Sequence, residues 1–81
     1  MAHDESSFKR GNIVRPSGGY AYLWKKAAFP VRSGEICFRM DSKTVGVVLD
    51  VRKFEDRVWL AVCCGDRIGW ETEKWFSLLE K

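Results

Sequence analysis

Residues 44–64, TVGVVLDVRKFEDRVWLAVCC, decide the fold, because two runs rich in β-branched residues flank one polar turn. β-branched side chains favour strands, and two such runs around a short polar turn are typical of a hairpin. The sequence therefore predicts paired strands over residues 44–52 and 57–64, joined by a turn around Lys53 to Asp56.

Alternation along this hairpin assigns a face to each side chain, because every second residue of a strand points the same way. Gly46 has no side chain and indicates a bulge or sharp bend that would curl the sheet. The pattern predicts two sets of residues. They are Val47, Leu49, Val51, Val58, Leu60 and Val62 pointing inward, and Asp50, Arg52, Arg57 and Trp59 pointing outward.

The chain after the hairpin continues as short strands. Gly65-Asp66 is a plausible two-residue turn, and a glycine in its first position favours type II′. Residues 67–71 then form a strand, TEKWF at 72–76 is compact enough for a single 3-10 turn, and SLLEK at 77–81 can return as the last strand beside the first.

The chain before the hairpin mixes strand and turn signals. Residues 1–7 look like a disordered leader, and a strand through Ile13, Val14 and Arg15 must end near Pro16. The stretch SGGYAYLWKKAAFPVRSG, residues 17–34, is predicted as a long loop, with one helical turn or an irregular hairpin as alternatives. EICFRM, residues 35–40, is expected to be a strand at an open edge of the sheet.

Several short strands without a long helix predict an all-β fold in one domain, residues 8–81. FKRGNIVR, GVVLDV, RVWLAV, RIGWE and FSLLE in this order resemble an SH3-like barrel of about five or six strands, with a long first loop and one 3-10 turn before the last strand. The chain looks particularly similar to small SH3-like proteins of phages and mobile elements. The resemblance implies that Trp70 caps one end of the barrel and that Trp75-Phe76 plug the other side of the turn.

Composition narrows the class of protein. An 81-residue chain with 46% hydrophobic residues should fold, and neither a signal-peptide pattern nor a long apolar run occurs, so we expect a soluble, cytoplasmic protein without membrane contact. Three cysteines (Cys37, Cys63 and Cys64) disfavour a closed disulfide framework, and the sole histidine, His3, lies in the leader. No metal site and no cofactor are therefore predicted.

Catalysis is not expected either. A nucleophile needs a base within reach, and none of the acidic residues stands in an apolar sequence context that would raise its pKa. The plasmid-borne, trimethoprim-insensitive dihydrofolate reductases are also short SH3-like chains. Their Val-Gln-Ile-Tyr motif is replaced here by RIGWE, so none of that family's catalytic residues is carried over.

Aromatic and basic residues mark the candidate binding surface. Tyr20, Tyr22 and Trp24 recur with period two and are followed at once by Lys25 and Lys26. These aromatics could stack on a partner or could pin the loop to the barrel. Trp59 is expected either to lie under the long loop or to be exposed for a partner.

Two functions remain open. The first is a non-catalytic protein-interaction or structural module, able to form homo-oligomers, that uses the long loop and the outward Trp59. The second is a nucleic-acid-binding module, motivated by seven basic against three acidic residues in positions 1–40, although the net charge is only +3. Its contact residues would be Tyr20, Tyr22, Trp24, Lys25, Lys26 and Arg32, with Arg15 and Arg39 as further candidates.

Overall fold

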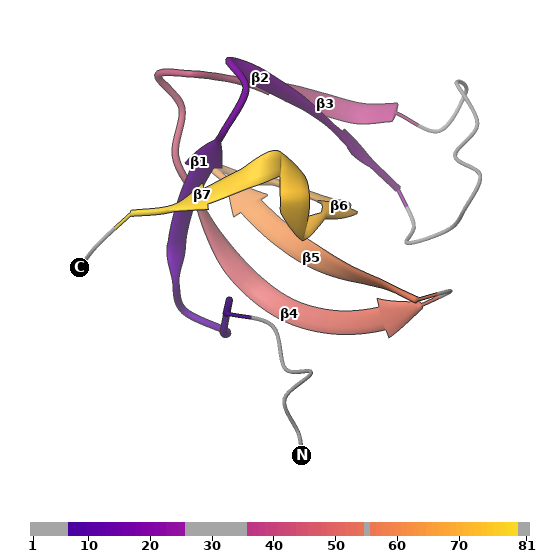
Figure 1. Cartoon of the computed structure of the whole chain (residues 1–81). Coiled ribbons are helices and arrows are strands. Elements are labelled where there is room, and N and C mark those ends of the chain that lie inside the picture. The colour runs from indigo at the N-terminus through magenta and orange to yellow at the C-terminus, as the bar shows by residue number, and fades with distance from the viewer. Residues whose placement is uncertain (1–6, 26–35, 55, 80–81) are drawn as a thin grey trace.

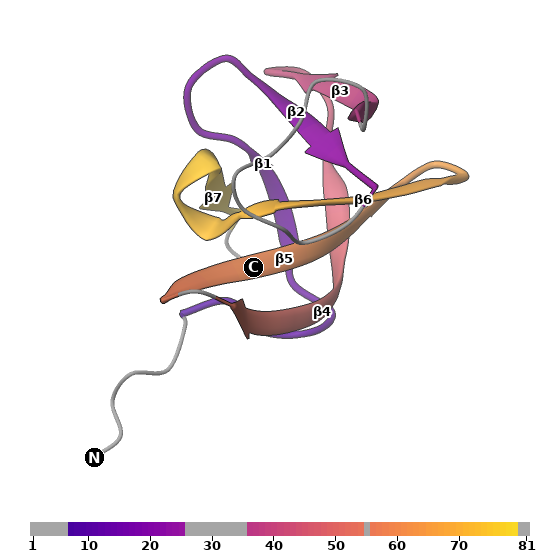
Figure 2. The same cartoon turned by 90° about the vertical axis from the view of Figure 1, so that its right-hand side faces the viewer.

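The computed structural model describes residues 7–25, 36–54 and 56–79, which form one antiparallel sheet curled into a half-barrel (Figures 1 and 2). The order of strands across the sheet is β3-β2-β6-β5-β4-β1-β7. The predicted all-β class is confirmed, with seven strands rather than five or six. The elements are β1 (Ile13–Pro16), β2 (Tyr20–Trp24), β3 (Ile36–Asp41), β4 (Gly46–Phe54), β5 (Arg57–Cys64), β6 (Arg67–Thr72), the 3-10 turn η2 (Glu73–Trp75) and β7 (Phe76–Leu78).

The central hairpin of β4 and β5 forms as predicted, but its turn is shorter. Pairing continues to Phe54 and Arg57, so only residues 55 and 56 connect the strands. Asp56 adopts a left-handed backbone conformation with φ of 64°, which type I′ hairpin turns use at their second central residue.

A β-bulge makes the predicted inward set wrong in the first half of β4. The pairing register shifts between Val48, which lies opposite Val62, and Asp50, which lies opposite Ala61. Leu49 is therefore an extra residue in β4, and an extra residue reverses the alternation on either side of it. Val48 is buried, whereas Val47 and Leu49 are exposed.

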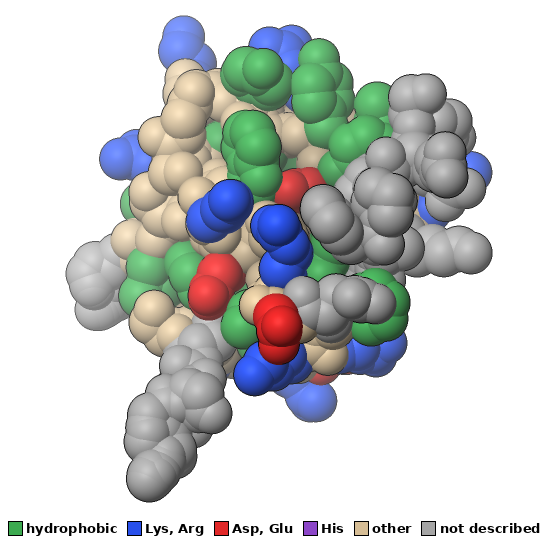
Figure 3. Space-filling model, turned by 45° about the vertical axis from the view of Figure 1, so that its right-hand side comes forward, with side chains coloured by type: hydrophobic (Ala, Val, Ile, Leu, Met, Phe, Trp, Pro, Cys, Tyr) green, Lys and Arg blue, Asp and Glu red, His purple; other side chains and the backbone are tan. Residues whose placement is uncertain are grey.

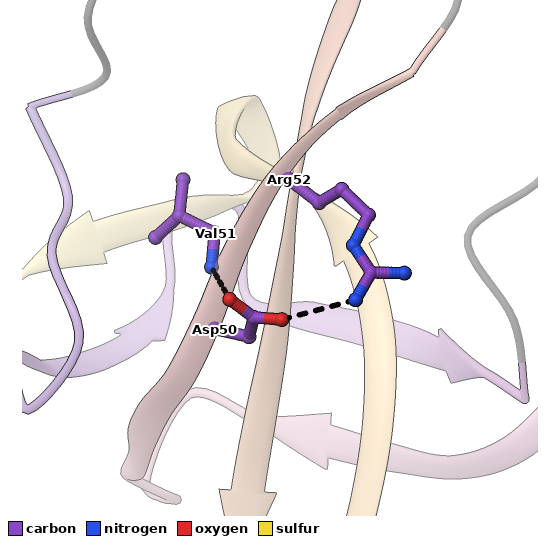
Figure 4. Close-up of polar contacts among 3 residues, drawn as sticks. All are labelled: Asp50, Val51 and Arg52. Carbon is purple, nitrogen blue, oxygen red and sulfur yellow. Dashed lines mark hydrogen bonds and ion pairs between the residues drawn. The ribbon is translucent and has the colours of Figure 1, made fainter.

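Polar contacts follow the bulge directly. Asp50 accepts a hydrogen bond from the Val51 backbone N–H at 2.9 Å and forms an ion pair with Arg52 at 3.2 Å (Figure 4). The Arg52 guanidinium also lies over the Trp70 ring, 5.1 Å from its centroid. Arg52 therefore links Asp50 to the half-buried Trp70 on the outer face of the sheet.

The second hairpin, β5 and β6, has the predicted two-residue turn. Cys64 pairs with Arg67, and only Gly65 and Asp66 lie between them. Gly65 has a positive φ of 68° whereas Asp66 does not, as a type II′ turn requires.

The stretch at Tyr20–Trp24 is a strand, so the prediction of a loop there is wrong. Ala21 and Leu23 are buried, and β2 pairs with β3 along its whole length. Pairing with β3 supplies the backbone hydrogen bonds, and the two buried side chains anchor the inner face of the strand. Residues 26–34 of the predicted loop, and residues 1–6 of the leader, lie outside the described residues.

The core fills the concave side of the sheet. It draws on every strand except β6, whose Gly69 faces it without a side chain. Phe76 is buried as predicted, but Trp75 is exposed and does not plug the barrel. The buried cluster consists of Val14, Ala21, Leu23, Phe38, Met40, Val48, Leu60, Val62 and Phe76.

The two edges of the sheet are formed by the strands that the sequence predicts. β3 is an edge strand, and β7 pairs with the first strand, β1, as predicted. Among the described residues, no helix is long and apolar enough to cross a membrane.

Candidate functional site

The outer face of β2 carries three aromatic side chains in a row. Tyr20 and Tyr22 are 41% and 42% exposed, and Trp24 is half-buried. The two tyrosine rings meet edge to face, with centroids 5.4 Å apart and an interplanar angle of 77°. Because Ala21 and Leu23 hold the opposite face of the strand in the core, the backbone that carries these rings is fixed.

These rings form one wall of a pocket, and two residues from later in the chain complete it. Trp75 comes from η2 and Glu71 from β6, and the pocket encloses about 170 Å³. Figure 3 shows hydrophobic side chains gathered on the upper part of the face in view, with an acidic side chain among them. We call the set Tyr20, Tyr22, Trp24, Glu71 and Trp75 the aromatic pocket.

Glu71 is the charged residue of the aromatic pocket and is only 8% exposed. Burial raises the pKa of its carboxyl group above the ordinary 4.5. Hydrogen bonds from the Thr72 backbone and from the Trp24 and Thr72 side chains oppose this rise in pKa; the Thr72 hydroxyl lies 3.4 Å from Oε2. The prediction that no acidic residue has apolar surroundings is wrong for Glu71.

Cationic side chains lie around the aromatic pocket rather than in its described lining. The Arg39 guanidinium of β3 lies over the Tyr20 ring, 5.1 Å from its centroid. Lys74 of η2 exerts a favourable charge interaction on Glu71, and Lys25 follows Trp24 as an exposed residue. The rim is therefore basic while the lining is acidic and aromatic.

The structure places the predicted binding residues in different environments. The structure brings Tyr20, Tyr22 and Trp24 together, and Lys25 adjoins them; Lys26 and Arg32 lie outside the described residues. Trp59 has the predicted outward register, opposite Arg52 and Thr72, but it is only 1% exposed. The alternative in which Trp59 is exposed for a partner is therefore wrong.

Sequence reasoning missed Glu71 and misplaced Trp75. Glu71 reads as an ordinary polar residue near the end of a strand, and its burial depends on the approach of β2 through the pairing of Trp24 with Trp70. The one available signal was η2, because a 3-10 turn that begins two residues after Glu71 keeps Trp75 near that carboxylate.

The described residues include no group of three or more His, Cys, Asp or Glu side chains that could hold a metal ion. The three cysteines are free thiols, and Cys37 donates a hydrogen bond to the Ile68 carbonyl at 3.4 Å. The described lining of the aromatic pocket consists of four aromatic side chains and one carboxylate. No family model matches the chain, and neither curated proteins nor solved structures give a significant match.

The buried Glu71 carboxyl predicts a pH-dependent loss of stability. Its pKa is higher in the folded than in the unfolded chain, so its stabilising contribution is full below pH 4.5 and is lost as the pH rises through the folded-state pKa. We expect the Glu71→Gln variant to gain stability relative to the unsubstituted protein over that range, because glutamine stays neutral.

Urea denaturation of both proteins from pH 4 to pH 8 measures this difference. Asp41 has the opposite tendency, because a hydrogen bond from Thr44 at 2.8 Å lowers its pKa, but it is common to both proteins and cancels. A difference that stays flat, or that grows toward acidic pH, would contradict the burial of the Glu71 carboxyl.

Proposed function

We propose that this protein is a non-catalytic protein-interaction module that receives one side chain of a partner protein in the aromatic pocket. The observation that carries the proposal is that four partly exposed aromatic side chains, three from β2 and one from η2, line one cavity. Aromatic residues dominate binding hot spots because they bury large areas at small cost in side-chain entropy.

Preorganisation supports this proposal. Tyr20 and Tyr22 stand on a strand whose alternate residues are fully buried, so partner binding would not have to order the backbone. The volume of the pocket also supports the proposal, because it is smaller than the roughly 300–1,000 Å³ of pockets that bind drug-sized ligands. A volume of about 170 Å³ suits the end of one side chain.

The lining favours binding over catalysis. Glu71 has a raised pKa, which is a property of many general acids. Acid–base chemistry on a substrate normally pairs such a group with a second carboxylate or a nucleophile. In the described lining the groups opposite Glu71 are phenol and indole rings.

Nucleic-acid binding is the second candidate, because Tyr20 and Tyr22 are exposed next to Lys25 and Arg39. Exposed rings could stack on bases while the cations contact phosphates. The Glu71 carboxylate in the lining of the aromatic pocket opposes this function, since it repels a phosphate backbone.

Selection of peptides from a random display library on the immobilised protein tests the proposal, with affinities then measured by tryptophan fluorescence. We expect selected peptides to lose about tenfold or more in affinity for Tyr22→Ala, because one anchoring ring contributes more than about 1 kcal/mol. Phe54→Ala is the matched control, because Phe54 is equally exposed but belongs to the tip of the β4–β5 hairpin.

Two outcomes would count against protein binding. Equal losses in Tyr22→Ala and Phe54→Ala would place the contact elsewhere. Saturable quenching by short single-stranded nucleic acid that weakens steeply with salt, without any selected peptide, would favour the second candidate.

The SH3-like assignment is part of the same proposal. It is supported by the succession of the two hairpins β4–β5 and β5–β6, the 3-10 turn η2, and a last strand beside the first. Kinship with proteins of phages and mobile elements, a cytoplasmic location and homo-oligomerisation through the edge strand β3 are proposed on the sequence pattern. A mass measurement in solution tests the last of these.

A further inference from the structure

Building on the proposed function, we infer that the group received by the aromatic pocket is a compact alkylated ammonium cation. The pocket surrounds a nearly buried carboxylate, Glu71, with the rings of Tyr20, Tyr22, Trp24 and Trp75. Aromatic rings carry negative charge on their faces and attract cations, most strongly in tryptophan. Rings and carboxylate therefore favour the same sign of ligand charge.

Among the residues that the structure describes, none forms an ion pair with the Glu71 carboxylate. Its hydrogen bonds come from neutral groups of Thr72 and Trp24, and the ion pair of Arg52 with Asp50 lies on another part of the sheet. Lys74 acts on this charge without an ion-pair contact, so the carboxylate stays costly to bury, and a cation entering the pocket would be stabilised there. An anion would be repelled, and a neutral group would bury the carboxylate further without compensation.

The lining also distinguishes among cations. A primary ammonium is strongly hydrated and needs several acceptors to replace its water. The described lining offers one carboxylate, and its remaining surface is mainly aromatic. An alkylated ammonium donates few or no hydrogen bonds and presents methyl groups to the rings, so it loses less on leaving water.

The volume of the aromatic pocket agrees with the size of an alkylated ammonium group. Apolar cavities of about 150 Å³ hold a benzene molecule. The aromatic pocket has a volume of about 170 Å³, which is enough for a quaternary ammonium head. Cation–ring contact already occurs at the rim, where the Arg39 guanidinium lies over Tyr20.

Choline and its neutral carbon isostere, 3,3-dimethyl-1-butanol, provide the direct test, because they differ in charge at nearly constant shape. We expect the full chain to prefer choline by about tenfold, as a desolvated cation–ring contact and a carboxylate together allow. Indole N–H resonances of Trp24 and Trp75 report the binding, because both side chains line the pocket.

Two variants locate the source of the preference. Glu71→Gln should reduce the preference for choline over its isostere several-fold, whereas Asp66→Asn, an exposed acid in the β5–β6 turn, should leave it unchanged. Trp75→Leu serves as a second test, because Trp75 is 40% exposed and its replacement spares the core. It should weaken choline binding about fivefold or more.

A peptide containing trimethyl-lysine, compared with its unmodified form, identifies where the cation comes from. Tighter binding of the modified peptide than of choline would indicate a protein side chain, and equal affinities would indicate a free small molecule; both outcomes support a cation site. Equal binding of choline and its isostere would overturn the inference, as would an unchanged preference in Glu71→Gln. If the cation inference fails but the library still yields peptides whose binding depends on Tyr22, the proposed protein-interaction function remains supported.

Discussion

The Gly69→Ala substitution is expected to lower the free energy of unfolding by about 2–3 kcal/mol, near the upper end for overpacking a core. A Cβ atom on residue 69 would lie 2.6 Å from the Leu23 Cβ and 3.2 Å from a Phe38 ring carbon. The Leu23 Cβ is fixed to its backbone, so relief requires β2 to move away from β6. The melting temperature should fall by roughly 10–20 °C for a domain of this size.

Thermal unfolding followed by circular dichroism measures this effect, with Gly18→Ala as the control. Gly18 has no positive φ, and a Cβ there would meet no atom within 4 Å. We expect its melting temperature to stay within a few degrees of the unsubstituted protein. Similar melting temperatures for Gly69→Ala and Gly18→Ala would show that β2 and β6 are not closely packed.

The Leu60→Ala substitution is expected to destabilise the fold by about 2–5 kcal/mol, because it leaves a cavity in the centre of the core. Leu60 is fully buried on β5, between Val51 of β4 and Glu71 of β6 in the pairing register. In a chain of 81 residues such a loss approaches the whole stability of the domain.

Leu49→Ala is the matched control, since Leu49 is the exposed extra residue of the bulge. Urea denaturation at constant pH should give a loss below about 1 kcal/mol for this variant. The bulge assignment would be rejected if Leu49→Ala proved as costly as Leu60→Ala, because Leu49 would then have to face the core.

Local patterns were sufficient to predict which segments of the second half of the chain are strands. β4, β5 and β6 follow one another through short turns. The β-branched runs are local signals for the strands, and Gly65 is a local signal for the β5–β6 turn. Phe76 and the 3-10 turn before it were also predictable. Nothing in those predictions required knowledge of contacts between distant segments.

The bulge and β2 could not be predicted in the same way. Alternation shows which residues share a face only if the register is unbroken, and the apolar run around Leu49 gives no sign of the break. Tyr20–Trp24 is bounded by turn residues, and it becomes a strand because β3 and β6 pair with it. The aromatic pocket depends on that same pairing, so Glu71 could not be recognised before β2 was placed.

The alternation of β2 also limits how the aromatic pocket can change during evolution. Ala21 and Leu23 belong to the core, while Tyr20, Tyr22 and Trp24 belong to the pocket, and the two sets interleave residue by residue. Inserting or deleting one residue within the strand would exchange the two sets and place the aromatic rings in the core. New ligand preferences can therefore arise through point substitutions in β2, whereas changes of length are confined to the segments that flank it.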